Sequence, residues 1–289
     1  TDASNFRLIV AESGSGGTMS EGSLIDGGTF NGNILAFSGI DLADGEYFTL
    51  GTALTTCGPG GVNTNISVWF RADKEAYSDL GTTLANDGEN MLQWGDQSSP
   101  NIDALELDLG GGASAIEPTF ETNEFNFNPT LRFTDPNSNN SSYFQTASTA
   151  VTGDFTLISI FKTGQAQGTD EDVLNSPALI SARNEGTDDY SMGIQGGTIW
   201  LDANSDNGFE VQTTGTYNDN QVHIVTSVKS ETALNLFVDS ENVGSGTGSA
   251  TLGSATGYGI GNHFNSDLQA QFAGDIAETI VFSSALSET

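Results

Sequence analysis

Acidic side chains at short spacings are the first residues of this chain that could do chemistry. Glu106 and Asp108 are two positions apart, which places both carboxylates on one face of a β-strand. Such a pair can hydrolyse a glycosidic bond, with retention when the carboxyl groups lie about 5–5.5 Å apart. Glycines follow this pair, and Asp275 and Glu278, three positions apart, are expected on opposite faces of their strand. We therefore predict no catalytic residues.

Nucleophilic and zinc chemistry find little support in the sequence. Cys57 is the only cysteine, and it lies in a Gly/Pro-rich stretch. The only histidines are His223 and His263, with no Gly-x-Ser-x-Gly elbow and no Cys/His zinc pattern. His223 alternates with Val222 and Ile224, which is typical of a strand residue that faces solvent or a polar neighbour.

A cation site is suggested by oxygen ligands at alternate positions, namely Asp202, Asn204 and Asp206. Such spacing can wrap a hard cation such as Ca²⁺. The following glycine is one place later than in an EF-hand loop, and no Glu stands at the twelfth position. The alternative is a hairpin turn between residues 199–201 and 209–211. Both interpretations stay open here.

Sugar binding needs exposed rings that stack on a pyranose face, next to side chains that hydrogen-bond hydroxyl groups. The best candidates are Tyr190 and Trp200, together with the loop residues Asn262, His263 and Asn265. A polar loop on a rigid scaffold is a common place for a binding site. The alternative is that Trp200 belongs to the core and that the loop is a connector.

These residues must be positioned by short strands. Residues 155–161 form a strongly apolar, central strand, and residues 221–228 and 234–238 form a hairpin pair. Residues 125–133 are expected to carry two short strands around Pro129. About a dozen such strands, abundant glycine and no long helix predict an all-β protein, an antiparallel β-sandwich or jelly roll.

The domain organisation follows from the Gly and Pro residues. Residues 1–56 are expected to form a short N-terminal β unit, such as the tail of an upstream domain. Residues 57–61 form a Gly/Pro linker, and residues 62–289 form the sandwich. Because the chain begins with Thr1 and ends where Ser287 could start a helix, we expect a fragment of a longer protein.

The charge excludes several partners. Seven Lys and Arg against 38 Asp and Glu give a net charge of −31. Such a surface repels nucleic acid and anionic membranes. No apolar run approaches the roughly 20 residues that span a bilayer, so no direct membrane insertion is expected. A single cysteine forms no intrachain disulfide, and the 17 Phe and 3 Trp predict an aromatic core.

The order of several blocks resembles a known family. Residues 222–228, followed by Leu-Asn-Leu-Phe-Val-Asp239, are similar to the signature of laminin-G-like modules, with Phe237 and Ser240 in place of the usual Tyr and Gly. This fold is also that of concanavalin-A-like jelly rolls. Further blocks at residues 68–73, 94–98, 127–133 and 274–278 resemble long cell-surface adhesins of Bacteroidetes-type bacteria that use type IX secretion, some linked to gliding.

The resemblance implies a fold and a secreted or cell-surface location, and it implies no ligand. Together with the candidate residues above, we expect a recognition module without catalytic activity, which binds carbohydrate with calcium as an optional cofactor. The expected partners are an extracellular glycan or a surface protein, and neighbouring domains of a longer chain or the secretion machinery. Two alternatives remain open at this point. One is a polysaccharide-active enzyme of the glucanase or lyase type on the same fold, and the other is a passive spacer or secretion cargo segment.

Overall fold

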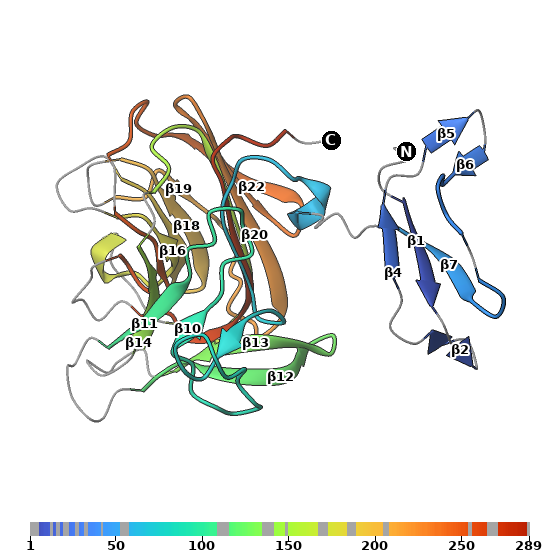
Figure 1. Cartoon of the computed structure of the whole chain (residues 1–289). Helices are drawn as coiled ribbons and strands as arrows, with labels where there is room; N and C mark the ends of the chain where they lie inside the picture. Colours follow the sequence, from blue (N-terminus) through green and yellow to red (C-terminus); the bar gives the residue numbers. More distant parts are fainter. Residues whose placement is uncertain are drawn as a thin grey trace. The chain divides into compact units, whose positions relative to one another are not determined.

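A computed structural model describes most of the chain (Figure 1). The described residues are 6–11, 14–15, 18–19, 23–26, 29–31, 34–41, 43–52, 58–108, 116–134, 142–147, 150–166, 173–183, 189–204, 208–253, 256–264 and 271–287. Within them the regular elements are β-strands and two 3₁₀ turns, η2 (Pro59–Gly61) and η3 (Val173–Asn175). No helix among these residues is long and apolar enough to cross a membrane. The all-β prediction is confirmed.

The chain divides into two compact units between Asn63 and Thr64, close to residue 62, where the sequence predicted the sandwich to begin. In the described part of the first unit, three antiparallel strands form one sheet, in the order β4 (Ser23–Asp26), β1 (Phe6–Ala11) and β7 (Tyr47–Thr52). Two small hairpins accompany it, β2 (Gly14–Ser15) with β3 (Thr18–Met19) and β5 (Thr29–Asn31) with β6 (Ile34–Ala36).

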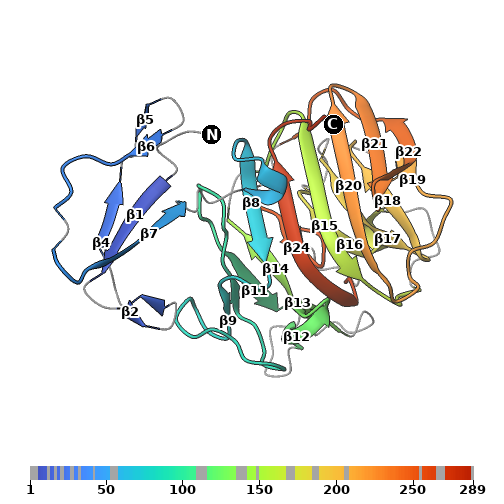
Figure 2. The ribbon, with the colours of Figure 1, turned by 90° about the vertical axis from the view of Figure 1, so that its right-hand side faces the viewer.

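The second unit is a β-sandwich of two antiparallel sheets. We name each sheet by the number of strands that it contains in the described residues. The nine-stranded sheet has the order β19 (Val211–Gln212), β18 (Thr198–Asp202), β17 (Ser191–Gln195), β16 (Ala178–Ser181), β23 (Gly259–Ile260), β14 (Ser142–Thr146), β11 (Ala104–Asp108), β10 (Gln93–Trp94) and β9 (Ala76–Tyr77). The eight-stranded sheet has the order β12 (Thr119–Phe125), β13 (Asn128–Phe133), β24 (Gly274–Phe282), β15 (Phe155–Lys162), β20 (Val222–Ser230), β21 (Ala233–Val238) and β22 (Glu241–Thr247), with β8 (Ile66–Arg71) paired to β24 (Figure 2).

The core lies between the two sheets, because alternate residues of each strand point inward. Leu157 and Phe161 of β15 face it from the eight-stranded sheet, and Met192 and Ile194 of β17 face it from the nine-stranded sheet. Burial of each such side chain stabilises the fold by about 1.5–3 kcal/mol. The predicted central strand is confirmed, since β15 lies between β24 and β20.

The block at residues 94–98 has a structural role. The buried Asp96 carboxylate accepts hydrogen bonds from the backbone N–H groups of Trp69, Ser98 and Ile102, and from the Ser98 hydroxyl. Four donors offset the cost of burying a charge. Asp96 therefore ties the segment after β10 to the first strand of the sandwich.

The prediction of two strands around Pro129 was wrong in its turn position. The chain reverses at Asn126 and Phe127, which both have positive φ (49° and 69°), and Pro129 lies inside β13. Positive φ at both central residues is the geometry of a tight hairpin turn. The turn falls before the proline because Phe125 pairs with Asn128.

Candidate functional site

The predicted sugar-stacking rings are buried. Tyr190 is 1% exposed and stacks on Phe155, with ring centroids 4.4 Å apart. Trp200 is fully buried and stacks on Phe209 at 5.1 Å. Neither ring has a free face for a pyranose, so this part of the prediction is corrected by the structure. Trp200 lies on the outer face of the nine-stranded sheet, where Gly193 leaves room for its indole: a Cβ there would come within 2.5 Å of the ring.

The predicted loop residues are buried as well. Asn262 and His263 are 0% and 1% exposed, and Asn265 lies outside the described residues. His263 Nε2 donates toward the carbonyl oxygens of Val173 (2.9 Å) and Ser176 (3.1 Å), which leaves Nδ1 to accept from the Ser181 hydroxyl at 3.1 Å. Burial, reinforced by Arg183, lowers the pKa of His263 to about 4. This neutral imidazole holds a loop against the nine-stranded sheet and does not face solvent.

The predicted cation loop contains a buried carboxylate beside an arginine. Asp202 is fully buried, and its Oδ2 lies 3.7 Å from Arg183 Nη1. Burial, and then the charge of Glu210, raise the pKa of Asp202 to about 10. Asn204 is half-buried, and Asp206 lies outside the described residues. No group of three or more His, Cys, Asp or Glu side chains in the described part of the chain is arranged to hold a metal, so the calcium site stays a prediction.

Of the hairpin interpretation, the structure shows the pairing of the flanking strands, while residues 205–207 of the predicted turn lie outside the described residues. Strands β18 and β19 pair through Trp200 with Gln212 and Leu201 with Val211.

His223 belongs to a structural cluster. Its Nδ1 lies 2.8 Å from Asp239 and its Nε2 lies 3.1 Å from Asp219. Asp239 also accepts the backbone N–H of Ile224 at 2.9 Å. Burial opposes the charge of the imidazole, but the hydrogen bonds to Asp239 and Asp219 outweigh it and raise the pKa of His223. The block that resembles the laminin-G-like signature thus joins β20 to the turn after β21.

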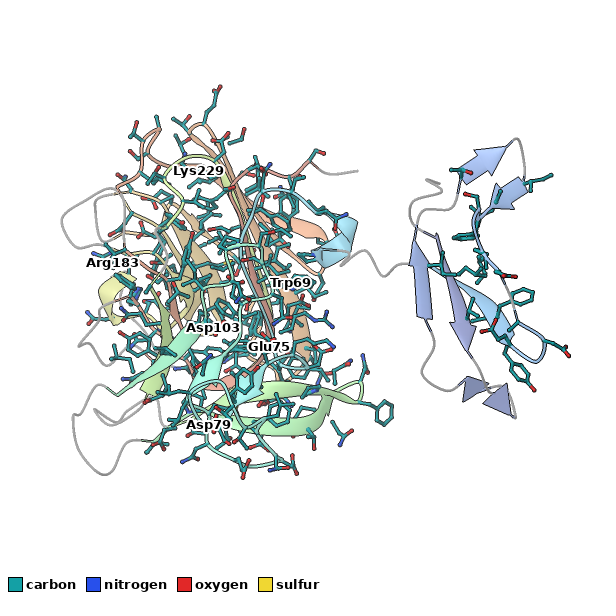
Figure 3. All side chains as sticks on the ribbon, in the orientation of Figure 1. Trp69, Glu75, Asp79, Asp103, Arg183 and Lys229 are labelled. Atoms are coloured by element: carbon teal, nitrogen blue, oxygen red, sulfur yellow. The ribbon has the colours of Figure 1, made fainter. Side chains whose placement is uncertain are left out.

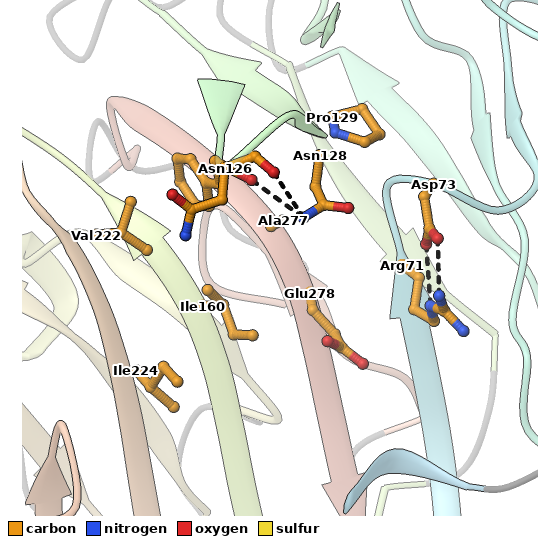
Figure 4. A pocket seen from close by; sticks show the side chains of 11 residues that line it. Arg71, Asp73, Asn126, Asn128, Pro129, Ile160, Val222, Ile224, Ala277 and Glu278 are labelled. Atoms are coloured by element: carbon orange, nitrogen blue, oxygen red, sulfur yellow. Dashed lines mark hydrogen bonds and ion pairs between the residues drawn. The ribbon is translucent and has the colours of Figure 1, made fainter. Parts of the chain in front are cut away.

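A pocket of about 340 Å³ opens on the outer face of the eight-stranded sheet, beside the β12–β13 hairpin (Figure 4). We call it the hairpin pocket. Its aliphatic lining consists of Ile160, Val222, Ile224 and Ala277, and two rigid side chains, Phe125 and Pro129, complete the apolar part. Its polar rim consists of Arg71, Asp73, Asn126, Asn128 and Glu278. Val222 and Ile224 are 42% and 45% exposed. No motif in the sequence pointed to this combination of residues.

A β-bulge in β24 brings Glu278 into the hairpin pocket. Lys162 pairs with Asp275 and Ile160 pairs with Glu278, so Ala277 is an extra residue in the register. Paired residues share a face, and so do residues 160 and 162. Asp275 and Glu278 therefore lie on the same face, and the prediction of opposite faces was wrong because it assumed regular alternation.

Glu278 is held by an aromatic neighbour. Its Oε1 accepts the indole N–H of Trp69 at 2.5 Å, and the Arg71 guanidinium lies 5.3 Å from the Trp69 ring. Arg71 donates from Nε and Nη2 to both oxygens of Asp73, at 2.9 and 2.7 Å. The rim therefore offers carboxylate acceptors in fixed positions. Figure 3 shows Trp69 and Arg183 on opposite sides of the sandwich.

Phe127 is the most exposed large apolar side chain of the sandwich among the described residues, at 89%. Its φ of 69° is a left-handed conformation that costs a residue with a Cβ about 1 kcal/mol or more. The turn is braced by Asn128, whose side-chain amide donates to the carbonyl oxygen of Phe125 at 3.1 Å. The fold thus holds an aromatic ring in water between two residues that line the hairpin pocket. The Asn126-Phe127 pair was the sequence feature from which this turn could have been predicted.

The predicted carboxylate pair of β11 does not reach this pocket. Glu106 is partly buried on the nine-stranded sheet, and the side chain of Asp108 lies outside the described ones. Asp275 lies beside the pocket, but Arg132 (2.8 Å) and Lys162 (3.2 Å) hold its carboxylate.

Comparison with solved structures finds the same fold. Domain 4 of AbnA, a family 43 extracellular arabinanase from Geobacillus stearothermophilus solved with arabinotriose, matches with a TM-score of 0.52 and 10% identity, over 77% of this chain and 94% of that one. The binding domain of Paraclostridial Mosquitocidal Protein 1 matches with a TM-score of 0.51 and 11% identity, over 78% of this chain. Botulinum neurotoxin type C, in a structure concerned with two ganglioside molecules, gives 0.50 and 9%, over 79%.

The chain spans about half the length of the toxin chains it matches, 50% in both cases. A search of curated proteins found no significant sequence match. The family model described as the concanavalin A-like lectin/glucanases superfamily, in its laminin-G-like form, matches residues 137–289, which is more than half of the chain. The chain belongs to this superfamily.

Proposed function

We propose that the sandwich is a non-catalytic carbohydrate-recognition module that binds its glycan in the hairpin pocket and against Phe127. The observation that carries this proposal is the exposed Phe127 ring, held at a positive φ between Asn126 and Asn128, which line a pocket with a polar rim. Strained backbone persists where the surrounding structure enforces it, and it clusters at ligand-binding sites.

The chemistry of the pocket suits a sugar. An aromatic ring offers a flat apolar face to the C–H groups of a pyranose or furanose. The amide of Asn126 and the carboxylates of Asp73 and Glu278 can exchange hydrogen bonds with ring hydroxyl groups. The aliphatic residues Ile160 and Ile224 cover the less polar edge of a sugar. A few fixed polar groups above an apolar floor are typical of a small-molecule site.

The comparisons support the class of ligand. The arabinanase domain that shares the fold was solved with arabinotriose, a neutral oligosaccharide. Exposure of Phe127 favours a binding module over a passive spacer, because a spacer gains nothing from a strained aromatic ring in water. As the sequence suggested, we place this module outside the cell, within a longer surface adhesin.

The enzyme alternative has weaker support. The superfamily includes glucanases, and Glu278 lies in the pocket, but a glycosidase needs a second carboxyl group free to act. Asp275 is engaged by two cations and Asp73 by Arg71. Release of reducing ends from a bound polysaccharide would argue for this alternative.

The proposal is tested on a glycan array, with and without calcium. Three proteins are compared: the wild type, Phe127→Ala, and Leu105→Ala as a control. Leu105 is also exposed (47%) but lies on β11 of the other sheet. We expect Phe127→Ala to weaken binding about tenfold, which is about 1.4 kcal/mol, and Leu105→Ala to bind as the wild type does. Equal binding by all three proteins, or none by the wild type, would contradict the proposal.

A further inference from the structure

The cations of this chain are few, and the structure shows how they are used. The sequence has seven Lys and Arg residues. A protein that selects a carboxylated or sulfated sugar uses a cation with free donors, most often an arginine whose fork can meet the anion. The hairpin pocket contains one cation, Arg71, and two carboxylates, Asp73 and Glu278. The fork of Arg71 is already bound on Nε and Nη2 by Asp73 (Figure 4).

The next two cations lie beside the pocket, and both are engaged. Lys162 contacts Glu124 at 2.9 Å and Asp275 at 3.2 Å. Arg132 contacts Asp275 at 2.8 Å, Glu124 at 3.0 Å and Glu121 at 3.4 Å. Three carboxylates thus surround two cations, and the group as a whole is negative. It offers an incoming anion no net attraction.

The remaining cations lie elsewhere. Arg183 is 7% exposed on the nine-stranded sheet, and Lys229 is buried with its ammonium group donating to the carbonyl oxygen of Glu231. Lys74 lines a neighbouring hollow whose lining also carries two carboxylates. Arg7 belongs to the N-terminal unit.

We propose that the hairpin pocket takes an uncharged sugar and rejects sugars that carry a carboxylate or a sulfate. This inference rests on the proposed function of the pocket. An anionic sugar would meet Glu278 and Asp73 at short range, while the net charge of −31 would slow its approach. A neutral sugar meets the same carboxylates as hydrogen-bond acceptors for its hydroxyl groups.

Asp73 gives the sharpest test, because it is the residue that occupies the Arg71 fork. Asp73→Asn removes the charge, keeps the size of the side chain and leaves the guanidinium free for another anion. We expect this variant to bind anionic sugars at least about tenfold more tightly than the wild type does. Arg71→Gln with Asp73→Asn is the control, because it removes the freed cation and should cancel the gain.

The experiment uses an array of neutral arabino-, gluco-, manno- and galacto-oligosaccharides with their uronate, sialylated and sulfated counterparts. The full chain, Phe127→Ala, Asp73→Asn and the double variant are screened after a melting curve confirms that each is folded. Binding to neutral members, weakened about tenfold in Phe127→Ala, supports the inference. Preference of the wild type for anionic members, lost in Phe127→Ala, would overturn the ligand class and keep the proposed function. Absence of binding, or binding indifferent to Phe127→Ala, would overturn both.

Discussion

The outer face of the nine-stranded sheet buries Trp200, Asp202 and His263, whereas the outer face of the eight-stranded sheet leaves Val222 and Ile224 nearly half exposed. Both faces combine aromatic, amide and acidic residues, so composition alone does not distinguish them. The difference is that loops and η3 cover the first face, while the described residues that border the second are the β12–β13 hairpin and the segment after β24 at Leu286, which leave Ile224 open between them. Polar and aromatic residues on a sheet face mark a binding site only where no other segment covers them.

The largest expected effect separates the two faces by stability. Trp200→Ala removes a fully buried indole that packs with Val173, Ala178 and Phe209, and should lower the free energy of unfolding by about 3–5 kcal/mol. Leu105→Ala, at an exposed position, should change it by no more than about 0.5 kcal/mol. Urea denaturation followed by tryptophan fluorescence or circular dichroism measures both. A stable Trp200→Ala protein that had lost glycan binding would indicate that the ligand site lies on the outer face of the nine-stranded sheet, the covered face.

His263, in the segment after β23, and His223, on β20, should give stability opposite pH dependences. His263 has a folded-state pKa of about 4, below its unfolded value near 6.5, so its contribution is complete above pH 6.5. That contribution, on the order of 3 kcal/mol, is lost as the pH falls from 6.5 to 4, because the unfolded state binds the proton. His223 has a raised pKa, so its contribution is present below pH 6.5 and is lost as the pH rises through the folded-state value.

The variant His223→Gln separates the loss of stability at alkaline pH from the loss at acidic pH. It should remove the loss of stability on the alkaline side and retain the loss on the acidic side. Melting temperatures measured from pH 4 to pH 9 would show this. An unchanged alkaline limb in His223→Gln would mean that the Asp219–His223–Asp239 cluster does not carry the charge we assign to it.

Calcium tests whether the covered face also binds a cation. If Asp202, Asn204 and Asp206 hold the ion, as the sequence predicts, millimolar calcium should stabilise the wild type by about 1 kcal/mol. Because its raised pKa keeps Asp202 protonated, calcium binding would release this proton. Asp202→Asn should abolish the response, and magnesium serves as the control ion. A melting temperature indifferent to calcium in both proteins would remove this site.

The smallest effect concerns the turn of the open face. Phe127→Gly removes the backbone strain of the positive φ but raises the conformational entropy of the unfolded chain. We expect a net gain in stability of about 0.5 kcal/mol. The same variant should bind glycan about tenfold more weakly than the wild type, as Phe127→Ala should. Stability and binding would then change in opposite directions at one residue. A loss of stability would show that the ring packs on the fold instead of serving a ligand.

The sequence was sufficient for the fold, because alternation in β15 and the β20–β21 pair follows from local residue types. It was insufficient for the site. Whether Trp200 is exposed depends on Val173 and Phe209, which no pattern within β18 reveals. The position of Glu278 depends on a bulge at Ala277, and spacing rules assume that none exists. The pocket itself joins residues from β8, β13, β15, β20 and β24, so it exists only once the sheet has formed.

Because Ala277 is an extra residue, the alternation of buried and exposed side chains shifts by one position within β24. On its N-terminal side Ile276 points into the core, and on its C-terminal side Thr279 and Val281 do. Deleting Ala277 would remove the extra residue, so Ile276 would still pair with Phe161 and Glu278 with Ile160, and both halves of the strand would stay in register. A strand that kept Ala277 but alternated regularly through it would instead turn Glu278 to the side of Ile276, toward the core, and the carboxylate would leave the pocket.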